Sequence, residues 1–144
     1  MGRTFQVTID CADPAALSAF WAEVLEYKLQ DPPAGFPTWE AFLEAQNVPR
    51  DLWNSASALV DPAGKGTRIF FQQVPEGKAA KNRLHLDVSV TEGPESPLEE
   101  RRARVKAASE RIVKLGASLV EFREVRGEHW AVMRDPEGNE FCLQ

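Results

Sequence analysis

The stretch DPEGNEFCLQ, from Asp135 to Gln144, combines a tight turn with a short alternating strand. An aspartate binds its own backbone, a proline fixes φ and a glycine accepts positive φ, so Asp-Pro-x-Gly is typical of a turn. The same motif occurs earlier as DPAG, from Asp61 to Gly64, again between two strand-like segments. A turn that recurs at the same place in two segments predicts that one structural unit is used twice.

Hydrophobic periodicity supports this prediction, because it gives both halves of the chain the same element order. Strands are expected at 4–11, at 27–30 and twice within 56–74, with a helix from Pro14 to about Glu26 and a shorter one after Thr38. The second half has expected strands at 83–90, 118–125, 129–134 and in the closing stretch, with a helix at 97–117. We therefore predict a single α+β domain (1–144) of two βαβββ modules, about 4–74 and 83–144, joined by a polar linker at 75–82.

Length and charge exclude several classes of protein. The 144 residues fit one domain, and 17 basic against 22 acidic side chains give a net charge of −5. We expect no nucleic-acid partner, because a general nucleic-acid binder needs a basic face. No apolar run is long enough to predict a membrane span, and the N-terminus lacks the pattern of a signal peptide. Two cysteines without CxxC spacing favour a cytoplasmic protein with reduced thiols.

Three stretches carry a resemblance to a known family: DCADPAALSAFWAEVL (10–25), VPEGKAAKNRLHLDV (74–88) and DPEGNEFCL (135–143). With them, the chain resembles the vicinal oxygen chelate superfamily of glyoxalase I, bleomycin-resistance proteins and extradiol dioxygenases, and in particular its glyoxalase-like domain proteins. The resemblance implies that each module curls its strands into a half-barrel. It also implies a cleft between the two modules, in which a substrate or metal is held.

Side-chain alternation indicates which residues line such a cleft. In strand 83–90 the polar face carries His85, Asp87 and Ser89, and in strand 4–11 it carries Gln6, Thr8 and Asp10. The opposite faces are apolar and are expected to pack against the helices: Leu84, Leu86, Val88 and Val90 in one strand, and Phe5, Val7, Ile9 and Cys11 in the other. Buried polar groups need partners, so polar faces with His and Asp indicate a cleft.

The resemblance places a metal ligand at His85, and its counterpart at Gln6 or, by the internal match of the two modules, at Thr8. The third position falls on Gln72 or Gln73, and the glutamate position of the last strand holds Cys142. Hard cations prefer carboxylates, which this set lacks. We therefore expect no cofactor and at most an incomplete site for a divalent metal at His85, with Asp10 or Asp87 as substitute ligands.

The remaining candidates concern ligand contacts and catalysis. His85, Asp87 and Asp10 are candidate catalytic residues, the two aspartates as an acid/base pair. Trp39 and Trp53 lie between the second and third strands, where they could form an aromatic lid or simply pack a short helix. Of His129 and Trp130, one must face the cleft, with Trp130 and Val132 the alternative core pair. The candidate ligand-binding residues are Gln6, Thr8, Trp39, Trp53, Gln72, His129, Trp130 and Cys142.

These residues favour one function over two others. We expect a small organic ligand, aromatic or apolar, bound in the cleft without a complete metal site, as in the drug-resistance branch of the superfamily. The first alternative is a lyase, isomerase or dioxygenase that uses His85, with or without a metal. The second is a domain whose main role is pairing, since proteins of this superfamily often form homodimers.

Overall fold

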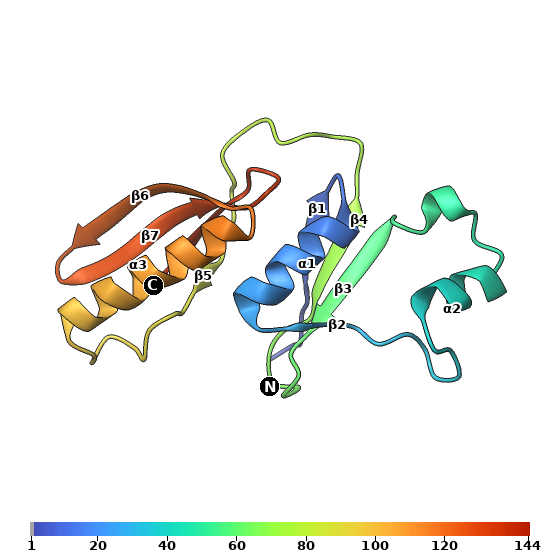
Figure 1. The fold of residues 1–144 in the computed structure, drawn as a ribbon, viewed down its shortest axis with the longest axis horizontal. Helices are drawn as coiled ribbons and strands as arrows, with labels where there is room; N and C mark the ends of the chain where they lie inside the picture. Colours follow the sequence, from blue (N-terminus) through green and yellow to red (C-terminus); the bar gives the residue numbers. More distant parts are fainter. Residues whose placement is uncertain (1) are drawn as a thin grey trace. The chain divides into compact units, whose positions relative to one another are not determined.

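The two predicted βαβββ modules are present in the computed structural model, which describes residues 2–144 (Figure 1). The chain divides into two compact units, the first ending at Gly77 and the second running from Lys78 to Gln144. The α+β class and the two-module organisation are therefore confirmed. The segment 78–82, which the sequence suggests is linker, belongs to the second unit.

The first module contains a four-stranded sheet and one long helix. Its strands are β1 (Val7–Cys11), β2 (Lys28–Leu29), β3 (Ala56–Val60) and β4 (Ile69–Gln73). Helix α1 (Pro14–Leu25) follows β1, and α2 (Trp39–Ala45) with a short 3-10 helix (Arg50–Leu52) lies between β2 and β3. The sheet order is β1-β4-β3-β2, with β1 parallel to β4 and the other pairs antiparallel.

The second module repeats this arrangement. Its strands are β5 (Asp87–Val88), β6 (Ser118–Val125), β7 (Glu128–Arg134) and β8 (Glu140–Leu143), and helix α3 (Leu98–Lys114) follows β5. The sheet order is β5-β8-β7-β6, again with one parallel pair, β5 with β8. Both sheets thus have the same order, in which the first strand of the module is followed by its fourth, third and second strands. This shared order confirms the repeat.

The repeated turn has the same hydrogen bonds in both modules. The N–H of Gly64 donates to the Asp61 carbonyl and that of Gly138 to the Asp135 carbonyl, both over 2.9 Å. The aspartate side chains accept from the backbone N–H groups of Ala63 and Glu137. The two glycines have φ of 69° and 86°, a region that disfavours other residues. The turn therefore fixes the antiparallel entry into the last strand of each module.

One face of each sheet is covered by the helix of its own module (Figure 1). Helix α1 starts where Asp13 caps it, accepting a hydrogen bond from the Ala16 N–H, with Pro14 at the first helical position. A hydrogen bond of 2.8 Å between the Ser18 and Ser57 hydroxyls joins α1 to β3. The fully buried side chains of the second module include Val105 and Ile112 from α3 and Ala131, Met133, Phe141 and Leu143 from the sheet.

The predicted alternation of buried and exposed side chains is confirmed in β7 and β8. It fails where a strand is shorter than predicted. Phe5 and Leu84, expected on apolar faces, are 75% and 88% exposed, because β1 begins at Val7 and β5 at Asp87. β8 is only four residues long and offers few partners to a longer β5. The alternative of Trp130 as a core residue is wrong, since Ala131 and Met133 supply the buried face of β7.

Among residues 2–144, no helix is both long enough and apolar enough to cross a lipid bilayer.

Candidate functional site

The sheet face of the second module that α3 does not cover carries several of the predicted site residues. Pairing places Asp87 beside Cys142 and Cys142 beside Val132, so these three side chains share a face. By alternation His85, Ser89, Trp130 and Gln144 lie on it too. We call this surface the open face of the second sheet.

A cluster of three chemically different side chains lies on the β5 and β8 side of the open face. The His85 Nε2 atom lies 3.3 Å from Asp87 Oδ1, and one ligand atom from each of His85, Asp87 and Cys142 lies within 4.8 Å of the other two. The side chains of His85 and Asp87 are 45% and 51% exposed. The cluster is therefore accessible from solvent.

The surroundings of Cys142 favour the protonated thiol. Burial is the main cause that raises the pKa of Cys142 above its usual value, and the negative charge of Asp87 and a hydrogen bond with it act in the same direction. The positive charges of Lys81 and Arg123 act weakly the other way. The protein alone therefore does not activate this thiol as a nucleophile.

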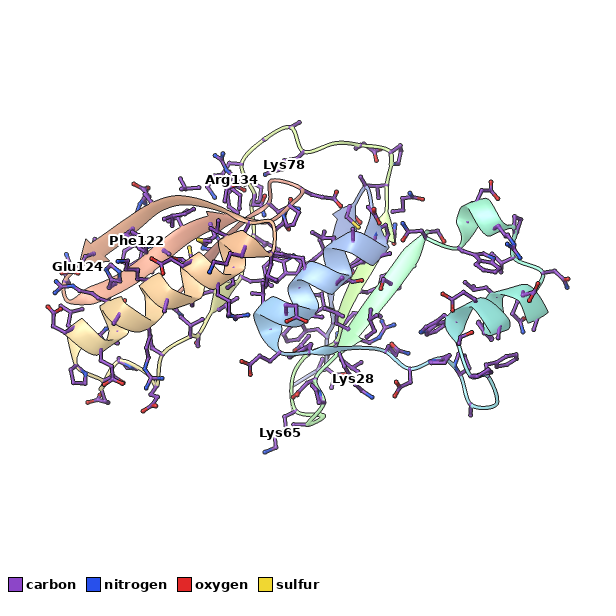
Figure 2. All side chains as sticks on the ribbon, in the orientation of Figure 1. Lys28, Lys65, Lys78, Phe122, Glu124 and Arg134 are labelled. Atoms are coloured by element: carbon purple, nitrogen blue, oxygen red, sulfur yellow. The ribbon has the colours of Figure 1, made fainter. Side chains whose placement is uncertain are left out.

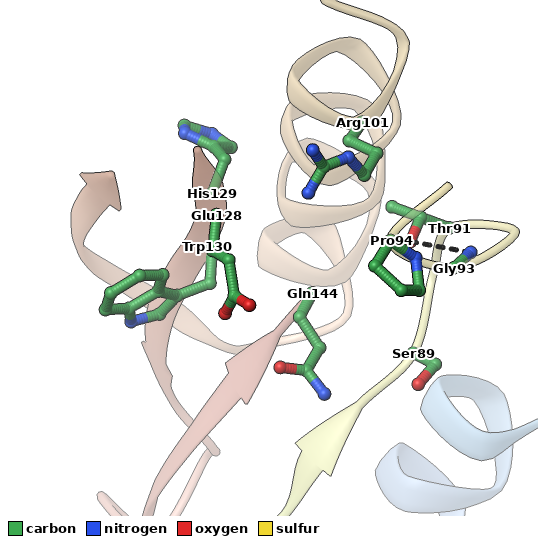
Figure 3. Close-up of a pocket in the computed structure, with 9 residues that line it drawn as sticks. All are labelled: Ser89, Thr91, Gly93, Pro94, Arg101, Glu128, His129, Trp130 and Gln144. Atoms are coloured by element: carbon green, nitrogen blue, oxygen red, sulfur yellow. Dashed lines mark hydrogen bonds between the residues drawn. The ribbon is translucent and has the colours of Figure 1, made fainter. Parts of the chain in front are cut away.

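A pocket of about 300 Å³ lies at the carboxyl ends of β5 and β8 and shares Ser89, Trp130 and Gln144 with the open face (Figure 3). Ser89 and Gln144 follow Asp87 and Cys142 by two residues on the same face, which is a step of about 7 Å along a strand. The pocket is lined by Ser89, Thr91, Gly93, Pro94, Arg101, Glu128, His129, Trp130 and Gln144. All of these belong to the second module, so one module forms the pocket by itself.

Arg101 of α3 is the positively charged group of this pocket, and its position is fixed by the backbone. Its Nε donates to the Ser96 carbonyl over 3.0 Å and its Nη2 to the Gly127 carbonyl over 2.9 Å. Glu128 supplies the opposite charge, and the hydroxyl groups of Ser89 and Thr91 add polar contacts. The lining therefore suits a ligand with polar groups at one end.

His129 and Trp130 both line the pocket, but their side chains leave β7 on opposite faces. The His129 ring stacks on Phe122, with centroids 5.7 Å apart, and its buried Nδ1 lies 3.3 Å from Glu124 Oε2 (Phe122 and Glu124 are labelled in Figure 2). Although the two atoms are close, the Nδ1 atom makes no hydrogen bond within residues 2–144. Arg102 holds the same carboxylate and is the main cause that lowers the pKa of Glu124. Trp130 is thus the aromatic residue of the open face.

The predicted residues of the first module form a separate group on its own sheet. Asp10 pairs with Gln72 and Thr8 with Phe70, so all four lie on the face that α1 leaves uncovered. Register also separates the two glutamines, since Gln73 pairs with Cys11 and donates to the Ala12 carbonyl. Gln6 lies before β1 and accepts a hydrogen bond from Arg68.

The predicted aromatic segment surrounds α2, none of whose residues is buried. Trp39 is 38% exposed, donates to the Gln30 carbonyl over 2.7 Å and meets Phe42 edge to face. Trp53 donates to the Val48 carbonyl over 2.9 Å and lies under the Arg50 guanidinium. The segment is held by local contacts of this kind, and its role as a lid stays a prediction.

Sequence reasoning missed the pocket residues Arg101 and Glu128 and the loop at 91–94. They come from three different segments, the loop 91–94, α3 and β7, so no local motif joins them. One signal was available: ligand sites often lie beyond the carboxyl ends of parallel strands, and the loop 91–94 follows β5 at such an end.

Glu140 is a second residue whose role the sequence did not reveal. Its carboxylate accepts from the Asn82 N–H over 3.0 Å and lies 3.1 Å from the Lys78 ammonium group, which Figure 2 labels. The Asn82 bond is the first cause that lowers the pKa of Glu140 to about 2. Glu140 therefore ties the segment 78–82 to β8.

Comparison with known proteins identifies the family of this chain. The glyoxalase-like domain family model matches residues 6–144, so the chain belongs to that family. No curated protein matches it.

Several solved structures share the fold. A glyoxalase/bleomycin resistance protein/dioxygenase family enzyme from Burkholderia phytofirmans is 20% identical, with 96% of this chain and 94% of that chain covered and a TM-score of 0.60. A possible glyoxalase from Bacillus cereus is 11% identical, with coverage of 100% and 99% and a TM-score of 0.63. A mutant of the fosfomycin resistance protein FosX from Listeria monocytogenes is 15% identical, with coverage of 100% and 90% and a TM-score of 0.62. These likenesses show the fold.

That FosX structure contains Mn(II) and 1S,2S-dihydroxypropylphosphonic acid, which raises the question of a metal in this chain. A hard ion such as Mn(II) prefers oxygen ligands. The cluster on the open face offers one carboxylate, one imidazole and one thiol. The predicted residues of the first module add Thr8, Asp10 and Gln72, without an imidazole. The donor chemistry of the open face therefore does not fit Mn(II).

Proposed function

We propose that this protein binds a small organic molecule on the open face of the second sheet, with one end of the molecule in the pocket beside Arg101. The observation that carries the proposal is that Ser89, Trp130 and Gln144 line the pocket and share a sheet face with the cluster of His85, Asp87 and Cys142. Ligand sites combine an apolar wall with a few polar groups in fixed positions. Trp130 is the apolar wall here, and Arg101 is the fixed polar group.

The chemistry of the lining suggests an aromatic or apolar body that carries a hydrogen-bond acceptor such as a carboxylate. Tryptophan presents a large apolar surface to flat ligands. The Nη1 group of Arg101 is not used in its two bonds to backbone carbonyls and could donate to the acceptor. That the ligand also lies between the two modules stays a prediction.

A thermal shift screen with aromatic carboxylates, in the presence of a chelator, tests this function. A compound present at 100 times its Kd should stabilise the fold by about 2.7 kcal/mol. Trp130→Ala and Arg101→Gln should each abolish most of this stabilisation. Arg111→Gln, an exposed arginine of the same helix, is the matched control and should keep it. Equal responses of all three variants would rule out the pocket.

An enzyme of the same family is the second candidate, favoured by the pairing of His85 with Asp87. A carboxylate 3.3 Å from Nε2 can hold an imidazole in a fixed orientation, which a general base requires. Incubation of each bound compound with the protein, followed by mass spectrometry, would reveal turnover. Product that forms with the unmodified protein and not with His85→Ala would establish catalysis through this residue.

A further inference from the structure

We infer that His85, Asp87 and Cys142 form a binding site for one zinc-class divalent ion, complete within the second module and open to solvent at its fourth position. The inference goes beyond the proposed ligand binding and does not depend on it. It also departs from the expected four-strand site of both modules, because all three donors come from β5, the residues just before it, and β8.

The register of the sheet creates the site. Asp87 and Cys142 are direct partners in the parallel pair of β5 and β8, and His85 precedes Asp87 by two residues on the same face. Asp87 thus places a carboxylate directly beside the Cys142 thiol. From the sequence alone Asp87 was only one of two substitute ligands, since pairing of this strand with β8 was not known.

The distances are close to those of a tetrahedral site. Zinc bonds of about 2.0 to 2.3 Å place neighbouring ligand atoms about 3.3 to 3.8 Å apart. His85 Nε2 and Asp87 Oδ1 are 3.3 Å apart, and the remaining separations do not exceed 4.8 Å. The longest separation must therefore shorten by about 1 Å, a shift that rotation about side-chain bonds can supply.

The chemistry of the donors selects the ion. Thiolate and imidazole suit Zn²⁺, whereas Mn²⁺ and Mg²⁺ prefer sites made of oxygen atoms. On binding, the sulfur–hydrogen bond of Cys142 is replaced by a sulfur–zinc bond, and the proton passes to solvent. Three protein ligands leave one position for water or for a ligand, which is the arrangement of zinc sites that are not purely structural.

Two positively charged side chains near Cys142, those of Lys81 and Arg123, do not prevent metal binding. Arg123 is already paired with Glu121, to which its Nε donates over 2.6 Å. Lys81 is exposed and can turn toward solvent. The side chains of His85 and Asp87 are each about half exposed, so the ion has a direct path to them.

Titration of the chelator-treated full-length protein with Co²⁺ and then Zn²⁺ tests the inference. One equivalent of Co²⁺ should give a sulfur-to-metal charge-transfer band, and Zn²⁺ should displace it, whereas Mn²⁺ should bind at least about 10-fold more weakly. Cys142→Ser should remove the band. His85→Ala and Asp87→Asn should weaken Co²⁺ binding by about 10-fold or more, since even residues outside the ligand shell have effects of that size.

Cys11→Ala is the matched control, because Cys11 is the only other cysteine and is buried in the first module. It should keep the band. Absence of the band in the unmodified protein, or its persistence in Cys142→Ser, would overturn the inference. Circular dichroism of each variant separates loss of the site from loss of fold. The ligand screen is run with a chelator, so its result and the metal result can fail independently.

Discussion

At the scale of single residues, Glu140 shows how one carboxylate can fix a segment that looks free in the sequence. It accepts from Asn82 and faces Lys78, and its side chain is only 11% exposed. Hydrogen bonds to a charged group contribute more to stability than neutral ones, about 1.5 to 3 kcal/mol when buried. The polar run at 75–82 therefore contains an anchored part, 78–82, and the anchor lies on β8.

This residue leads to a prediction about acid stability. The pKa of Glu140 is about 2 in the folded protein against an ordinary 4.5, so its contribution is fully present above about pH 4.5 and is lost as the pH falls toward 2. Glu140→Gln should lower stability by about 1 to 2 kcal/mol at pH 7 and weaken the decline between pH 4.5 and 2. Urea unfolding at several pH values measures both effects.

Glu76→Gln is the control for this experiment, since Glu76 is exposed in the loop before the second module. Its stability curve should follow that of the unmodified protein. A Glu140→Gln variant with the same acid-induced decline as the unmodified protein would show that the carboxylate is not the group responsible.

At the scale of elements, the two Asp-Pro-x-Gly turns share most of their hydrogen bonds but differ in their surroundings. Asp135 is 3% exposed and accepts from the backbone N–H groups of Glu137 and Asn139. Asp61 accepts from three N–H groups, of Ala63, Lys65 and Gly66, but lies in an exposed turn. Backbone groups left unpaired in a buried turn cannot bind water instead.

We therefore expect unequal effects from matched substitutions. Asp135→Ala should destabilise the protein by about 2 kcal/mol or more, because it leaves buried donors without partners. Asp61→Ala should have a smaller effect at pH 7. Thermal unfolding of both variants measures the difference, and equal losses would contradict a role of burial.

The pH dependence of Asp61 can be stated as well. Its hydrogen bonds to backbone N–H groups, that of Ala63 first, hold its pKa below the usual value. The contribution of Asp61 is therefore present above its ordinary pKa and is lost as the pH falls below that value. Replacement by alanine should remove this part of the acid sensitivity.

Local signals explain which elements the sequence predicted well. The start of α1 follows from Asp13 and Pro14, which act within a few residues of themselves, and both turns follow from their own four residues. The length of β5 was wrong because strand extent depends on a partner far away in the sequence. For His129 and Trp130, both side chains suit either face, so only the pairing of β7 with β8 decides between them.

At the scale of the whole molecule, the second module exposes apolar side chains along one edge of its sheet. β6 is the edge strand of its sheet and is exposed along its whole length. Val120, Phe122 and Val125 on it are 45%, 42% and 54% exposed. A bulge at Val120 interrupts the ladder, so contact through side chains is favoured over further strand pairing.

The homodimer that the sequence suggested can be tested at this surface. Light scattering should give a mass of twice the 16.1 kDa of one chain. The double variant Val120→Lys and Val125→Lys should shift the mass to that of one chain, because charges oppose burial of this strand. A single-chain mass for the unmodified protein would exclude the dimer, and a dimer that survives both lysines would place its interface elsewhere.

The anchoring of segment 78–82 has a consequence for the way proteases meet this chain. Trypsin must draw a basic side chain out of the protein before it can cut beside it. The ammonium group of Lys78 contacts the Ala80 carbonyl, Asn82 and Glu140, whereas Lys81 is exposed and has no ion pair within residues 2–144. Tryptic cleavage in this stretch should therefore begin after Lys81. Cleavage after Lys78 should follow only when the contact between Lys78 and Glu140 has broken.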